Sequence, residues 1–141
     1  MRFSTRSEYG IRVMVRLGRG FGHGPIPLAE LAELEGLPPS YLEQIAGQLR
    51  RAGLVTSRMG VKGGYALARR PAAISMADIV RNLEGSLAPV SCLAEGGGPG
   101  ECTHADTPCS AHAFWERLQG TITSTLESVT VADLMKEAQP A

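Results

Sequence analysis

The feature that most constrains the fold is a pair of short helical patterns joined by a proline turn. Apolar residues recur at helical spacing over 28–35 and again over 41–52. Ser40 and Glu43 have the spacing of a capping box, which would begin the second helix after the turn. Two helices joined by so short a turn predict a helix-turn-helix.

The hydrophobic period changes after Gly53. Residues 54–56 favour a strand, and residues 65–67 are apolar at alternate positions. The stretch 58–64 between them is rich in glycine and carries two cations, so we expect a β-hairpin with a basic tip. Helix, turn, helix and hairpin in this order predict a winged helix-turn-helix, in which the hairpin is the wing.

Further helices surround this unit. We expect one over 4–17, one that opens at the capping pair Ser75 and Asp78, a long one over 111–128 and a last one over 131–138. The long helix carries a narrow apolar stripe, typical of a coiled-coil seam between two copies of the chain. The stripe consists of Trp115, Leu118, Ile122, Leu126 and Val129.

The sequence thus predicts a mainly α fold with a small β-hairpin wing and a long C-terminal dimerisation helix. Residues 1–72 would form the winged helix-turn-helix DNA-binding region. Residues 73–110 would hold a connecting helix and a cysteine loop, and residues 111–141 the dimerisation helix and a C-terminal helix.

Net charge is zero over the whole chain, but the two halves differ. Residues 1–70 contain eleven Lys and Arg against five Asp and Glu, whereas residues 71–141 contain three against nine. A basic half suggests contact with a polyanion. No apolar run approaches the roughly 18–20 residues of a membrane span, and no apolar signal core is evident, so we expect no membrane partner and a cytoplasmic protein.

Several side chains of the basic half could contact double-stranded DNA. The start of the second helix would enter the major groove, where Gln44 can pair with adenine. Glu43 can accept a hydrogen bond from a cytosine amine or penalise wrong sites. The wing would approach the minor groove with its cations. The predicted contact residues are Arg2, Ser40, Tyr41, Glu43, Gln44, Arg50, Arg58 and Lys62.

Three cysteines lie within 92–109, and a histidine follows with the spacing Cys92-x9-Cys102-x6-Cys109-x2-His112. In a reducing compartment such a cluster indicates metal binding or redox activity before a disulfide scaffold. Thiolates favour Fe–S clusters, zinc or cuprous ion. Free thiols and a disulfide switch remain open alternatives at this stage.

Enzyme signatures do not appear in the chain. It has no His-Glu pair on a helix, no Cys-x2-Cys and no glycine-rich phosphate loop at a strand–helix turn. We therefore do not expect an enzyme.

The chain resembles the IscR/NsrR family of bacterial winged-helix regulators over nearly its whole length. The segments that carry the resemblance are Met1-Arg2-Phe3-Ser4, Pro39-Ser40-Tyr41-Leu42-Glu43-Gln44, Gly60-Val61-Lys62-Gly63-Gly64-Tyr65, Ile74-Ser75-Met76-Ala77-Asp78-Ile79 and the three-cysteine loop before the helix with Trp115. The resemblance implies a homodimer that crosses through the long helix and binds palindromic promoter DNA.

The resemblance also implies an iron–sulfur cluster held by Cys92, Cys102 and Cys109. His112 matches the fourth ligand of 2Fe–2S members, and Glu8 matches the region of a carboxylate that the partner subunit supplies in nitric-oxide-sensing members. We favour 2Fe–2S over 4Fe–4S, because the Cys-x2-His unit is complete, although the cysteine spacings are longer than those of IscR. Iron, redox state or nitric oxide would then control DNA affinity. The alternative is a thiol-based redox regulator of the same fold without a metal cluster.

Overall fold

The computed structural model describes residues 2–94 and 109–137 of the chain. Within these residues, six α-helices and one hairpin follow in the order that the sequence predicts, and two short 3-10 helices lie between them. They are α1 (Thr5–Arg19), α2 (Leu28–Glu35), α3 (Pro39–Arg51), β1 (Val55–Arg58), β2 (Gly64–Leu67), η1 (Pro71–Ala73), α4 (Met76–Glu84), η2 (Ser91–Leu93), α5 (His112–Ser128) and α6 (Val131–Glu137). The predicted winged helix-turn-helix is confirmed.

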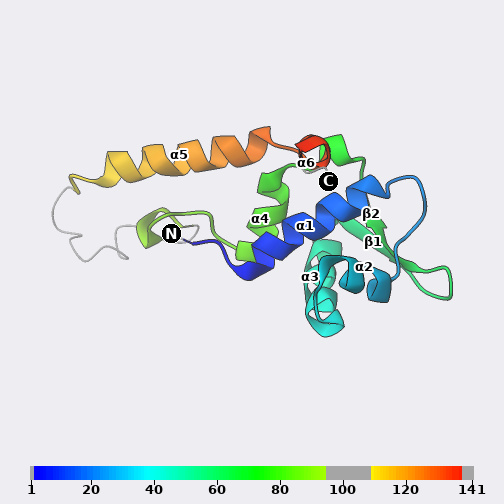
Figure 1. The fold of residues 1–141 in the computed structure, drawn as a ribbon. Helices are drawn as coiled ribbons and strands as arrows, with labels where there is room; N and C mark the ends of the chain where they lie inside the picture. Colours follow the sequence, from blue (N-terminus) through cyan, green and yellow to red (C-terminus); the bar gives the residue numbers. More distant parts are fainter. Residues whose placement is uncertain (1, 95–108, 138–141) are drawn as a thin grey trace.

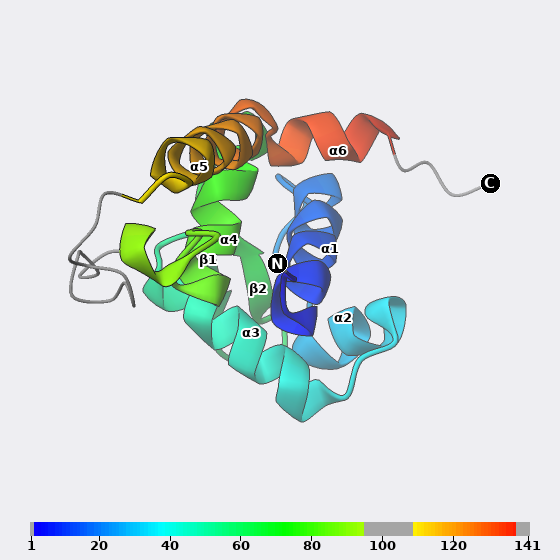
Figure 2. The ribbon, with the colours of Figure 1, turned by 90° about the vertical axis from the view of Figure 1, so that its left-hand side faces the viewer.

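Helix α1 lies at the centre of the core. Helices α2, α3, α4 and α6 and the hairpin pack around it, as Figures 1 and 2 show from two sides. Val13 and Met14 of α1 are completely buried. Gly10 allows α4 to cross closely, because a Cβ there would collide with the Leu83 side chain. At Gly18 a Cβ would lie 2.9 Å from the side chain of Val131, so α6 also requires a glycine in α1.

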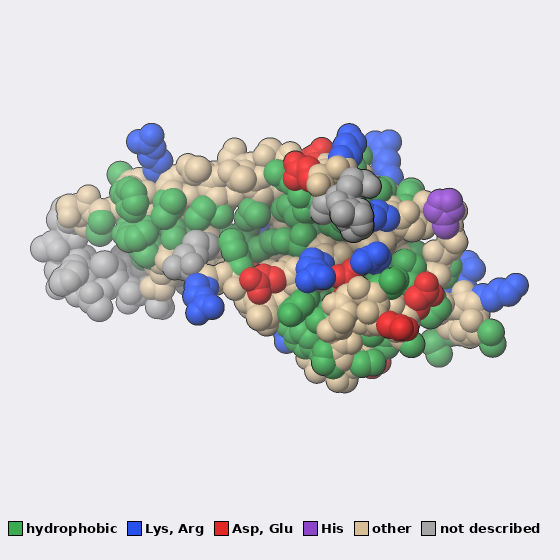
Figure 3. Space-filling model, in the orientation of Figure 1, with side chains coloured by type: hydrophobic (Ala, Val, Ile, Leu, Met, Phe, Trp, Pro, Cys, Tyr) green, Lys and Arg blue, Asp and Glu red, His purple; other side chains and the backbone are tan. Residues whose placement is uncertain are grey.

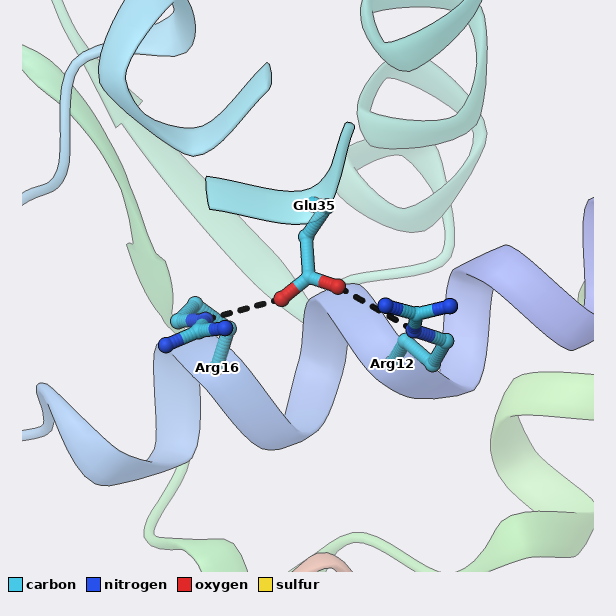
Figure 4. Close-up of polar contacts among 3 residues, drawn as sticks. All are labelled: Arg12, Arg16 and Glu35. Carbon is cyan, nitrogen blue, oxygen red and sulfur yellow. Dashed lines mark hydrogen bonds and ion pairs between the residues drawn. The ribbon is translucent and has the colours of Figure 1, made fainter. Parts of the chain in front are cut away.

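A buried ion pair joins α2 to α1 (Figure 4). The Glu35 side chain is only 3% exposed, and its two carboxylate oxygens meet different arginines of α1. Arg16 Nε donates to Oε1 over 2.8 Å, and Arg12 Nε lies 3.2 Å from Oε2. Because both oxygens are paired, the buried carboxylate is compensated and α2 is fixed on α1.

One of the two predicted capping boxes forms, and the other does not. Ser75 and Asp78 make a reciprocal capping box at α4, and Asp133 accepts hydrogen bonds from the backbone and side chain of Thr130 at α6. The capping box predicted from Ser40 and Glu43 is wrong. Helix α3 begins earlier, at Pro39, because proline has the φ angle of a first helical residue and needs no N–H partner there.

A third segment, at Ile26, pairs with the hairpin that forms the wing. β1 and β2 pair antiparallel with Val55 opposite Leu67. Tyr65 also exchanges two backbone hydrogen bonds of 2.9 Å with Ile26, in the loop that follows α1. Gly64 makes this approach possible, because it has φ +143° and a Cβ there would overlap the Ile26 carbonyl. The hairpin is thus fastened to the helical core.

Helix α5 differs from the other helices. It extends well beyond the body of the molecule (Figure 1), and none of its residues is buried. It contacts α4, and α6 then returns to the core with Val131 completely buried. The stripe residues Trp115, Leu118, Ile122 and Leu126 are only half-buried, and Phe114 is 58% exposed. The apolar face of α5 is therefore incompletely covered within one subunit.

Candidate nucleic-acid interface and cysteine segment

Helix α3 and the wing enclose an open groove of about 540 Å³. The end of α3 is tied to β1, because Arg50 Nη1 donates to Ser57 Oγ over 3.3 Å. Three arginines line the groove, against a single acidic side chain, that of Glu43. The cationic lining residues are Arg50, Arg51 and Arg58. Such a surplus of positive charge suits a polyanionic backbone.

A second hollow borders the exposed face of α3 on the side away from the wing. Arg6, Ser40 and Gln44 line it. Glu43 and Gly47 line both hollows, so they lie on the ridge between them. The structure therefore places the predicted contact residues Ser40, Glu43 and Gln44 on one exposed face of α3.

Gly47 also belongs to this face, although it is not among the contact residues that the sequence predicts. It lies inside α3, where glycine costs about 0.5–1 kcal/mol relative to alanine. A Cβ there would meet only the Arg51 guanidinium, at 3.4 Å, so the fold of the chain does not require glycine. A lone glycine within a helical pattern was the available signal, and close approach of a ligand is its most direct explanation.

Tyr41 is occupied by contacts to α1. Its ring meets that of Tyr9 edge to face, with centroids 6.2 Å apart, and its hydroxyl lies 3.2 Å from Thr5 Oγ1. These contacts fix the start of α3 on α1. Its predicted contact with DNA stays a prediction.

The remaining predicted contacts are spread over exposed segments. Arg2 precedes α1, Arg58 ends β1 and Lys62 lies in the tip of the wing. Figure 3 shows Lys or Arg side chains beside hydrophobic ones at the end of the wing. Helix α3 and the wing therefore both expose cations.

The start of α1 is fastened to the end of α4 by one carboxylate. Glu84 Oε1 accepts hydrogen bonds from Ser4 N (2.5 Å), Ser4 Oγ (2.8 Å) and Ser7 Oγ (2.7 Å). Burial alone would raise the pKa of Glu84, but the hydrogen bonds from Ser7 and Ser4 outweigh it and lower the pKa below its ordinary value. The ionised form therefore holds the two helices together.

Three of the candidate cluster ligands, Cys92, Cys109 and His112, lie on either side of residues 95–108, which are outside the described residues. Cys92 in η2 is half-buried and Cys109 is exposed, and both are free thiols. Cys102 lies outside the described residues. His112 is the first residue of α5, and its Nε2 lies 3.0 Å from Glu116 Oε1. Glu8 is exposed in the first turn of α1.

Within residues 2–94 and 109–137, no three His, Cys, Asp or Glu side chains gather closely enough to hold a metal ion. The donor set still fits an iron–sulfur cluster chemically, since three thiolates and an imidazole supply four ligands of the required type. Ligation by these residues stays a prediction.

The helix pair, the hairpin fastened beside it and the basic groove define a winged-helix DNA-binding protein. A family model described as "Rrf2: Iron-dependent Transcriptional regulator" matches residues 3–137. The chain belongs to this family. It is therefore a DNA-binding transcriptional regulator and not an enzyme, as the sequence predicts.

The relatives of this chain include regulators named CymR and IscR. The regulator CymR of Bacillus subtilis is 37% identical over 134 residues, covering 95% of this chain and 89% of its own. IscR of Vibrio cholerae is 34% identical over 137 residues, covering 97% of this chain and 76% of its own.

The similar solved structures also include CymR and IscR proteins. CymR of B. subtilis, "the Global Cysteine Regulator", has a TM-score of 0.83 at 34% identity and covers 99% of both chains. "T. potens IscR" has a TM-score of 0.77 at 37% identity and covers 99% of this chain and 89% of its own. No helix in the described ranges is long and apolar enough to cross a membrane.

Proposed function

We propose that the chain is a dimeric regulator that binds palindromic promoter DNA and whose affinity is controlled by an iron–sulfur cluster. The observation that carries the DNA contact is the common exposed face of α3 and the wing, with three arginines in the groove between them. The start of α3 would enter the major groove and the wing the neighbouring minor groove.

Each contact residue has a distinct chemical part in this proposal. Gln44 would pair with adenine, and Ser40 would reach phosphate or a base edge. Arg2, Arg50, Arg58 and Lys62 would neutralise phosphates or enter the narrow groove. Glu43 would reject phosphate and accept from cytosine, so its replacement by alanine should relax sequence preference more than it weakens binding.

A second copy of the chain would cover the apolar face of α5. Its half-buried stripe and the exposed Phe114 support this part of the proposal. One winged domain alone contacts too little DNA for high specificity. Light scattering at micromolar concentration should give a particle mass twice the chain mass of 14.9 kDa. The Trp115→Glu variant should have the mass of a single chain.

Cys92, Cys102 and Cys109 would hold the cluster, with His112 or Glu8 of the partner subunit as fourth ligand. When bound, such a cluster supplies a centre sensitive to iron supply, oxidation and nitric oxide. His112 already pairs with Glu116 through Nε2, so its role as a ligand depends on whether that pair opens or the other ring nitrogen is used. The donor chemistry and the likeness to IscR support a 2Fe–2S cluster.

A continuous series of contacts leads from the cysteine segment to α3. The Cys92 segment follows the end of α4, where Glu84 binds Ser4 and Ser7 at the start of α1. One residue after Ser4, Thr5 meets the Tyr41 hydroxyl at the start of α3. We infer that cluster binding by the cysteine segment changes the position of α3 through these contacts. A coupling of about 1–3 kcal/mol would alter DNA affinity about 5–150-fold.

The deciding experiment is anaerobic purification of the full chain. We expect a coloured protein with iron, sulfide and a spin-resonance signal after reduction, and a colourless Cys102→Ala variant whose DNA affinity ignores iron. Parallel His112→Ala and Glu8→Ala variants identify the fourth ligand by loss of the cluster spectrum. Iron-responsive DNA binding that persists in Cys102→Ala would overturn the cluster proposal.

A thiol switch without metal is the second candidate. Free thiols at Cys92 and Cys109 and the likeness to CymR favour it, and one similar solved structure is described as the oxidised form of Staphylococcus aureus CymR. An iron-free and sulfide-free anaerobic preparation whose DNA affinity still changes on reversible oxidation would support this candidate and exclude the first.

A further inference from the structure

Two large apolar side chains lie almost free in solvent at the tip of the wing. Met59 is 94% exposed and Val61 is 102% exposed, more than any other large hydrophobic residue in the described chain. The proposed roles of the wing cations leave both side chains unexplained. Exposed apolar groups gathered at one point commonly mark a contact surface.

The tip fixes the backbone on which these two side chains stand. Gly60 has φ +101° and its carbonyl accepts a 3.0 Å hydrogen bond from the Gly63 N–H, which closes a tight turn. Gly63 is buried against the backbone of Arg58, and a Cβ at Gly63 would collide with that carbonyl. The base of the hairpin is fastened to Ile26. The turn therefore presents Met59 and Val61 outward on a rigid support.

The charge around the tip indicates a polyanion as the occupant. Arg58 and Lys62 flank the apolar pair on either side, and Arg50 and Arg51 line the groove behind it. A solely apolar partner would leave these cations without compensation. The minor groove of DNA, about 6 Å wide, has phosphates on both rims and apolar sugar walls inside. It matches both the cations and the apolar pair.

We propose that the wing tip enters the minor groove as an apolar wedge, with Met59 partly unstacking one base step and Val61 packing on the sugar walls. Methionine is unbranched and adaptable, and minor-groove proteins use such side chains to open and kink base steps. This inference rests on the proposed approach of the wing to DNA and specifies what the wing does there. It predicts specificity for an easily unstacked pyrimidine–purine step under the wing.

The test uses the full chain and duplexes that it selects from a random-sequence pool. The probe is 2-aminopurine, placed at successive positions of the selected duplex, since its fluorescence rises when it unstacks. We expect one position to brighten on binding. Met59→Ala should abolish the rise and weaken binding roughly tenfold. It should leave the dependence of affinity on salt unchanged, because no charge is removed.

Three further variants separate the wedge from other effects. Lys62→Ala should reduce the salt slope by about one and keep the fluorescence rise. Met59→Leu, which is apolar and of similar volume, should recover the rise that Met59→Ala loses. Phe21→Ala removes an apolar side chain that is 44% exposed on the loop after α1 and does not line the groove. It should change neither measurement.

The outcomes distinguish this inference from the proposed function. Selected duplexes that bind tightly but brighten at no position would overturn the wedge and leave DNA recognition intact. So would a Met59→Ala variant with the wild-type rise. Failure of the full chain to select any duplex would instead overturn the proposed function, and the wedge with it.

Discussion

The DNA-reading region, formed by α1–α4 and the wing, is packed differently from the cysteine-bearing region, residues 85–94 and 109–128. In the first, each helix buries an apolar face on α1, and Glu35 buries its charge between two arginines. In the second, α5 has no buried residue and both described thiols remain free. One chain therefore buries the core of its DNA-reading region, whereas the described residues of its cysteine-bearing region leave the apolar face of α5 incompletely covered.

Removal of charged partners should give the largest difference between the two regions. The double variant Arg12→Ala/Arg16→Ala leaves the Glu35 carboxylate buried without a partner and should lower the free energy of unfolding by roughly 3 kcal/mol. Arg81→Ala breaks the exposed pair of Arg81 with Glu127, between α4 and α5, and should cost less than about 1 kcal/mol. Urea unfolding measures both. Equal losses of unfolding free energy in the two variants would contradict the contrast between the two regions.

Glycine replacements test how tightly the two regions are packed. Gly10→Ala forces a Cβ against Leu83 and should destabilise the fold by about 1–3 kcal/mol. Gly120 lies in α5 with nothing within 4 Å, so Gly120→Ala should stabilise the isolated subunit by about 0.5–1 kcal/mol. Thermal unfolding at several protein concentrations checks both. A destabilising Gly120→Ala would show that a partner covers that side of α5.

Acid should weaken the contact between the start of α1 and the end of α4, directly before the cysteine-bearing region. The pKa of Glu84 is lower in the folded chain than its ordinary value of 4.5, so its contribution is complete above that value. It is lost as the pH falls through the folded pKa. The wild-type Tm should therefore fall more than that of Glu84→Gln between neutral pH and pH below 4.5. Parallel falls in the two proteins would refute this role of Glu84.

A small effect on stability, equal in size to that of Gly120→Ala, is expected at Gly47. Gly47→Ala should raise the free energy of unfolding by about 0.5–1 kcal/mol, since a Cβ there meets only Arg51. Affinity for selected duplexes should fall, because the new methyl group projects from the exposed face of α3. Fluorescence anisotropy measures the affinity. A variant that is more stable and binds equally well would show that the glycine has no part in DNA contact.

The sequence predicted the DNA-reading region well because its signals are local. Apolar periods and capping pairs such as Ser75 with Asp78 report directly on helices. The start of α3 was misjudged, since the Ser40–Glu43 spacing competes with Pro39, which fits the first helical position better. The bridge between Ile26 and Tyr65 was not foreseen, because pairing across so many residues leaves no local pattern.

The candidate site was predictable by residue type and less so by arrangement. The cations of the wing are visible in the sequence, whereas the contacts of Tyr41 with Tyr9 and Thr5 depend on how α1 and α3 pack. No local sequence pattern marks Glu84, because its partners Ser4 and Ser7 lie at the opposite end of the DNA-reading region in sequence. The proposed ligands Cys92, Cys109 and His112 come from the separate segments η2 and the start of α5, so local spacing cannot fix their arrangement.

The two backbone bonds between Ile26 and Tyr65 have a consequence for target choice. They make the hairpin and the helical core a single rigid body, so neither can be adjusted alone to a misplaced half-site. In the paired assembly proposed above, one extra base pair between half-sites turns the second site by about a tenth of a helical turn. Helix α3 and the wing of the second subunit would then both miss their grooves. DNA affinity should therefore fall sharply, and not gradually, when the spacer between the half-sites changes length.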